Sequence, residues 1–139
     1  MPLIDVMTKR GFRLQVSGSG PMTATGPFLR RTLGPQLPKL FASNSAAFGM
    51  GDTPESGVQV TFREFSPDDI NTPDLWVKVQ LSEEPPEAAE QARIRGAIFD
   101  ALVGLMHGHN LRAPDNFVLD VLWGPTSGCG SVNGVFIEW

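Results

Sequence analysis

The feature that most constrains the fold is a strand, a long helix and a second strand, which follow one another between residues 75 and 123. Residues 75–81, LWVKVQL, alternate hydrophobic and polar side chains, a pattern typical of a strand with one buried face. Residues 89–106 place Ile94, Ile98 and Leu102 on one side of a helix. Residues 117–123, FVLDVLW, are nearly all hydrophobic, as expected of a buried strand. Short connections between these elements predict a βαβ unit with parallel strands.

The first half of the chain follows the same order less regularly. Residues 2–7, PLIDVM, and 57–65, GVQVTFREF, are predicted strands. Residues 28–41 between them have helical spacing, but Pro35 and Pro38 must break or kink a helix there. Residues 11–26 are expected to form a loop or hairpin, and 49–56 a loop. We therefore expect an α/β fold of two consecutive βαβ units, with a four-stranded mixed sheet and two helices on one face. The alternative is a different fold for the proline-containing half.

Length and charge limit the class of protein further. A chain of 139 residues predicts a single domain over residues 1–139. A net charge of -4 argues against a nucleic-acid partner, and the hydrophobic runs are too short to span a membrane. No secretory signal is apparent, and the single cysteine, Cys129, fits a reducing cytoplasm. A sheet with helices on one face leaves its other face to a partner, which favours an oligomer.

Pro2 carries candidate chemistry, because a proline at an N-terminus has a secondary amine without a flexible side chain. A free α-amine has a pKa of roughly 8. Burial against hydrophobic neighbours lowers the pKa of an amine toward neutrality, where it can act as a general base. This chemistry requires removal of Met1, and the alternative is that Pro2 simply begins a strand.

The order of these elements resembles that of the tautomerase superfamily, and in particular its macrophage migration inhibitory factor and 5-carboxymethyl-2-hydroxymuconate isomerase types. The resemblance rests on PLIDVM at the start, the long helix, LRAPDNFVLDVLW before and within the last long strand, and GSVNGVF after it. It implies a homotrimer in which Pro2 is the catalytic base of a keto–enol tautomerisation, with no cofactor and no metal. The expected substrate is a small keto or enol acid.

A carboxylate substrate needs a cation, and arginine offers two parallel N–H donors. The resemblance places this role on Arg10 or Arg13, just after the first strand; Arg63 in the second strand is a further candidate. The alternative for the segment KRGFR is a solvated loop. Several decarboxylases and dehalogenases of the superfamily carry arginines after the third strand, where this chain has Ser82, Glu83 and Glu84. Those activities are therefore disfavoured.

Asp120 is the second candidate catalytic residue. By the same resemblance, Gly124 stands where some relatives have a carboxylate, and Asp120 falls near a hydrogen-bonding position. A carboxylate within a hydrophobic strand is costly unless it is paired, so Asp120 is either functional or paired with an arginine at a subunit interface. The following GPTSGCGSVNG lacks the lysine and helix of a nucleotide-binding loop and fits a hairpin that reaches a neighbouring subunit.

Two function classes follow from these observations. The first is a tautomerase or isomerase that uses Pro2 as base and Asp120 or a backbone amide to stabilise the enolate oxygen. The second is a non-catalytic trimeric binding or structural protein on the same fold. Removal of Met1 and an arginine near Pro2 favour the enzyme, whereas a retained Met1 and the acidic turn after residue 81 favour the binding protein.

Overall fold

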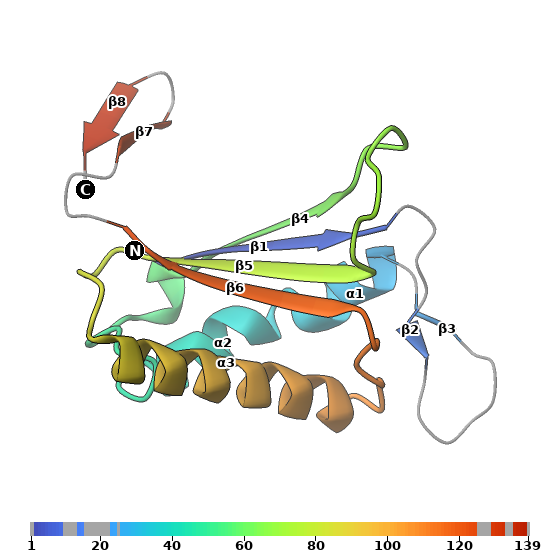
Figure 1. Cartoon of the computed structure of the whole chain (residues 1–139), viewed down its shortest axis with the longest axis horizontal. Coiled ribbons are helices and arrows are strands. Elements are labelled where there is room, and N and C mark those ends of the chain that lie inside the picture. Colours follow the sequence, from blue (N-terminus) through green and yellow to red (C-terminus); the bar gives the residue numbers. More distant parts are fainter. Residues whose placement is uncertain are drawn as a thin grey trace.

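A four-stranded mixed sheet with helices on one face forms the body of the protein (Figure 1). The computed structural model describes residues 2–9, 14–15, 23–24, 26–124, 129–132 and 135–138. The strands of the sheet are β1 (Leu3–Thr8), β4 (Gln59–Glu64), β5 (Leu75–Leu81) and β6 (Phe117–Trp123), in the order β4-β1-β5-β6. The pairs β1–β4 and β5–β6 are parallel, and β1–β5 is antiparallel. The two predicted βαβ units are confirmed, side by side in one sheet.

Side chains along the strands alternate between two faces of the sheet. Ile4 and Val6 of β1, and Val77 and Val79 of β5, are almost completely buried against the helices. The intervening positions form the opposite face, which we call the open face. It carries Trp76, Lys78 and Gln80 of β5 in register with residues of β1 and β6. Three of the large hydrophobic residues on this face are exposed: Leu3, Val118 and Leu122.

The second βαβ unit is covered by one continuous helix, α3 (Ala88–Gly108). Its buried side chains, Ile94, Ile98, Leu102 and Met106, recur every four residues and so lie along one side of the helix. The helix ends where Asn110 adopts a positive φ of 57°, a conformation that asparagine tolerates better than most residues. These bounds extend the predicted helix by one or two residues at each end.

The first unit is covered by two shorter helices, α1 (Gly26–Leu33) and α2 (Gln36–Ser43), on the same side of the sheet as α3 (Figure 1). The two helices are separated by Gly34 and Pro35. The Gly34 N–H still donates a hydrogen bond to the Arg30 carbonyl at 3.1 Å. Pro38 is the third residue of α2, and it is tolerated there because N–H groups of the first turn have no helical acceptor. The helix predicted over residues 28–41 is therefore present as two.

Two small hairpins and a short 3₁₀ helix, η1 (Glu55–Gly57), complete the described structure. β2 (Leu14–Gln15) pairs with β3 (Thr23–Ala24) in the segment expected to be a loop or hairpin. β7 (Cys129–Val132) pairs with β8 (Val135–Glu138), and this hairpin extends beyond the end of the main sheet (Figure 1). No helix among the described residues is both long and hydrophobic enough to cross a membrane.

Candidate active site

The N-terminal segment places Pro2 at one rim of the sheet. β1 and β4 begin at this rim, β5 and β6 end there, and α3 begins there after the turn that follows β5 (Figure 1). Pro2 is buried, and its carbonyl accepts a hydrogen bond from the Gln59 N–H at 3.1 Å. This bond extends the β1–β4 ladder by one step and fixes Pro2 to the start of the central strand. We call this region the Pro2 rim.

Gln80, near the end of β5, and Gly124, directly after β6, contact each other at the Pro2 rim. Gln80 is half-buried on the open face and pairs with Leu3 of β1. Its Nε2 donates to the Leu81 carbonyl at 3.3 Å, and the Gly124 N–H donates to the same oxygen at 2.7 Å. A Cβ at Gly124 would lie 2.8 Å from Gln80 Nε2, a distance too short for two heavy atoms. Gly124 therefore leaves the space that the Gln80 amide occupies.

Aromatic and charged side chains surround this rim on the helix side. The guanidinium carbon of Arg95 lies 5.0 Å from the centre of the Trp123 ring, a cation–π contact between α3 and the end of β6. Near the start of α3, Arg93 Nε donates to a carboxylate oxygen of Glu90, in the first turn, at 2.9 Å. This hydrogen bond holds the pKa of Glu90 below its ordinary value. Glu83 is half-buried and follows β5 at the same rim. The rim therefore carries the carboxylates of Glu83 and Glu90 and the guanidinium of Arg95 stacked on Trp123.

The three predicted substrate-binding arginines differ in where they lie. Arg10 and Arg13 lie outside the described residues. Arg63 is described, and its Nε is 3.0 Å from Asp5 Oδ1, which also accepts a hydrogen bond from the Thr61 hydroxyl at 2.7 Å. Arg63 is four residues further along β4 than Gln59, which corresponds to about 13 Å of strand. A single chain therefore does not bring Arg63 to Pro2; instead Arg63 joins β4 to β1 through Asp5.

Asp120 lies in the middle of the open face. Its Oδ2 accepts a hydrogen bond from the Trp76 indole N–H at 2.7 Å. It is in register with Lys78, whose Nζ lies 4.2 Å from the centre of the Trp76 ring. From Pro2 it is three residues along the strands and two strands across, about 10 Å in each direction. In one chain, then, the partner of this carboxylate is a tryptophan rather than an arginine, and Pro2 is distant.

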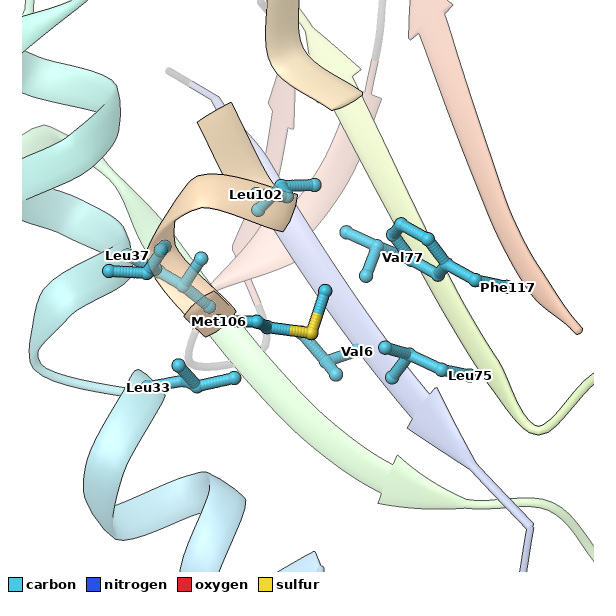
Figure 2. Close-up of a pocket in the computed structure, with 9 residues that line it drawn as sticks. Val6, Leu33, Leu37, Leu75, Val77, Leu102, Met106 and Phe117 are labelled. Atoms are coloured by element: carbon cyan, nitrogen blue, oxygen red, sulfur yellow. The ribbon is translucent and has the colours of Figure 1, made fainter. Parts of the chain in front are cut away.

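A hydrophobic pocket lies at the opposite end of the sheet (Figure 2). It is lined by side chains from β1, the starts of β5 and β6, and the three helices: Val6, Leu33, Leu37, Leu75, Val77, Leu102, Leu105, Met106 and Phe117. None of these side chains can exchange a proton or bind a charged group. The pocket is therefore a gap in the packing between helices and sheet, and it offers no group for acid–base chemistry.

Gln80 is a residue of this rim that the sequence alone does not mark as part of a site. Strand alternation places Gln80 on the face opposite Val79 and Leu81. Its position near the end of the predicted strand is the one feature of the sequence that points to a site at the rim. Its proximity to Pro2 depends on the antiparallel register between β1 and β5, which no local pattern specifies. Among the described residues, no three histidine, cysteine, aspartate or glutamate side chains gather to hold a metal ion.

Comparison with known proteins defines the fold. No protein-family profile matches the chain, and no curated protein matches it in sequence. Among solved structures, N1, a member of the cis-3-chloroacrylic acid dehalogenase family, aligns with a TM-score of 0.57 at 12% identity, over 98% of this chain and 83% of that one. A fused 4-OT described as a symmetric trimer aligns with a TM-score of 0.52 at 15% identity, over 96% and 94% of the two chains.

A third structure, native Ps01740, aligns with a TM-score of 0.55 at 19% identity, over 90% of this chain and 96% of that one. The alignments cover nearly the whole of this chain in each case, so the likeness includes both βαβ units. The chain thus has the fold of these solved structures, and this is the fold that its resemblance to the tautomerase superfamily implies. At these identities the likeness concerns the fold, and the chemistry must be argued from the residues.

Proposed function

We propose that this protein is a proline-dependent tautomerase or isomerase that moves a proton on a small keto or enol acid. In this proposal Met1 is removed and the secondary amine of Pro2 is the general base. The observation that carries it is the position of Pro2: it is buried at the start of the central strand, with its carbonyl hydrogen-bonded to Gln59, on a tautomerase-superfamily fold.

The surroundings of Pro2 suit an amine that must be neutral to accept a proton. Removal from water disfavours the charged form of an amine, so a buried terminal proline is poised to act as a base. The ring prevents rotation about the N–Cα bond, and the bond to Gln59 holds the residue in line with β1. Holding the base in a fixed position lowers the entropic part of the barrier to proton transfer.

The substrate class follows from the cations that come after β1 in the chain and from the carboxylates that come after β5. Arg10 and Arg13 come directly after β1 in the chain, and we assign to them the binding of the substrate carboxylate. Glu83 and Glu84 follow β5, where a second arginine pair would serve dehalogenation or decarboxylation of an acid. The acidic turn therefore favours tautomerisation over those reactions.

The open face supports assembly as a homotrimer. Leu3, Val118 and Leu122 are 37%, 36% and 50% exposed on this face, and a partner would bury them. The β7–β8 hairpin extends beyond the sheet, and an isolated two-stranded hairpin is marginally stable unless it packs on something. The fused 4-OT that shares this fold is described as a symmetric trimer. In the proposed trimer, Asp120 and Lys78 lie at or near contacts between copies.

The test begins with the untagged protein, whose intact mass reports whether Met1 is absent and whose sedimentation reports the assembly. Ketonisation of the enol of phenylpyruvate, followed by ultraviolet absorbance, then measures turnover. Pro2→Ala should lower kcat/KM by about 100-fold or more, because positioned general bases contribute at least that factor. Pro67→Ala, an exposed proline in the loop after β4, is the matched control and should leave turnover unchanged. A retained Met1, or full activity in Pro2→Ala, would refute the mechanism and favour a binding protein.

A further inference from the structure

We propose that Gln80 determines which substrates the Pro2 rim accepts, by binding the end of the substrate that is distal to the proton transferred. This inference rests on the proposed function and adds to it a substrate class. The distal end is a neutral hydrogen-bonding group, such as an amide, a carbonyl or a hydroxyl, rather than a second carboxylate.

The register of the strands sets the distance between Pro2 and the Gln80 amide. Leu3 pairs with Gln80, so Pro2 lies level with Leu81 on the neighbouring strand. The Gln80 amide lies beside the Leu81 carbonyl and Gly124, on the side of β5 that faces β6. It is therefore one to two strand spacings from Pro2, about 5–10 Å. A small keto acid with a substituent spans this distance, with its reacting carbon at Pro2 and its far end at the amide.

The Gln80 amide has hydrogen-bonding capacity to spare. Its one hydrogen bond among the described residues is the 3.3 Å contact from Nε2 to Leu81, which is long for an N–H donor. The second N–H and the Oε1 acceptor have no partner within the described part of the chain. A carboxamide offers both a donor and an acceptor, so it matches a neutral amide or hydroxyl better than it matches a carboxylate.

Gly124 is the positioning residue for this amide. A Cβ there would stand 2.8 Å from Gln80 Nε2, so any side chain at position 124 would displace the amide from the rim. Glu83 and Glu84 add the electrostatic part of the selection, because they follow directly on β5 and repel a second negative charge. Space, hydrogen bonding and charge at this end of the rim all favour a neutral group.

The test compares two matched substrates, the enols of 4-carbamoylphenylpyruvate and 4-carboxyphenylpyruvate, which differ only in the charge of the distal group. The wild-type protein should turn over the carbamoyl compound with the higher kcat/KM. In Gln80→Leu that preference should fall by about 10-fold, the value of one or two hydrogen bonds, through KM rather than kcat. Gln80→Arg should reverse the preference. Gly124→Ala should lower the preference as Gln80→Leu does, whereas Pro67→Ala, which lies outside the rim, should leave the kcat/KM of both compounds unchanged.

The outcomes separate this inference from the proposed function. Turnover that depends on Pro2 together with an unchanged preference in Gln80→Leu would overturn the role of Gln80 alone. Absence of turnover in the wild-type protein would overturn the tautomerase, and calorimetric binding of the two compounds then still tests Gln80. Equal binding of the compounds to the wild-type protein, or binding that Gln80→Leu leaves unchanged, contradicts the inference.

Discussion

The two βαβ units of this protein share one topology but cover their strands in different ways. The second unit uses a single helix of 21 residues, whereas the first uses two helices of eight residues each, separated at Gly34 and Pro35. Both helical layers lie on the same face of the sheet (Figure 1). This fold therefore needs a hydrophobic layer over each parallel strand pair, and the continuity of the helix is secondary.

The largest effect should come from emptying the core beneath either layer. Ile98→Ala in α3 and Leu37→Ala in α2 truncate side chains that are 0% and 2% exposed, so each should lower the free energy of unfolding by about 2–5 kcal/mol. Urea unfolding followed by circular dichroism measures both, and Asp100→Ala on the exposed side of α3 is the control. A cost for Leu37→Ala close to that of Asp100→Ala would contradict the equivalence of the two layers.

An intermediate effect, opposite in sign between the units, should follow from replacing glycine by alanine. At Gly34 a Cβ would lie 2.3 Å from the Arg30 carbonyl oxygen, so Gly34→Ala should destabilise the protein by about 1–3 kcal/mol as the backbone shifts. At Gly104, inside α3 and exposed, nothing lies within 4 Å of the new Cβ, and Gly104→Ala should stabilise by about 0.5–1 kcal/mol. Thermal unfolding of the two variants distinguishes them; shifts of the same sign would show that the break between α1 and α2 is not set by Gly34.

The smallest effect concerns charge at the helix starts. Neither α1 nor α2 has an acidic residue in its first turn, whereas α3 has Glu90, whose pKa is lowered chiefly by its hydrogen bond with Arg93. A carboxylate with a lowered pKa stabilises the fold above its ordinary pKa near 4.5, and this contribution is lost as the pH falls through the lowered value. Glu90→Gln should therefore lower Tm slightly at pH 7, and the difference should shrink as the pH falls below 4.5. A Tm difference that grows on acidification would contradict the assignment.

The sequence predicted the second unit better than the first for a physical reason. Residues 75–81 and 117–123 match β5 and β6 without correction, because strong alternation and strong hydrophobicity leave few alternatives. Prolines within residues 28–41 indicated a break but not its position, since Pro38 is harmless in a first turn while Gly34 and Pro35 end α1. The distinction depends on where α2 begins, which is set by packing against the sheet.

For the candidate site, too, local sequence predicts some positions, whereas contacts between distant parts of the chain cannot be predicted from it. The sequence placed Pro2 at the start of a strand, and its position at the rim is a direct consequence. The pairing of Arg63 with Asp5, and of Trp76 with Asp120, depends on strand order and register across distant parts of the chain. For the same reason the closeness of Gln80 and Gly124 became visible only in three dimensions.

If Pro2 is the base that we propose, the hydrogen bond from the Gln59 N–H to its carbonyl reduces the entropic cost of the proton transfer. A lysine used as a base has several rotatable bonds, and ordering them costs up to about 2 kcal/mol when substrate binds. The nitrogen of Pro2 belongs to the backbone, and pairing of β1 with β4 already orders it when the sheet folds. Pro2, which precedes the first residue of β1, is thus ordered before any ligand arrives, and a loss of the hydrogen bond from Gln59 would free it.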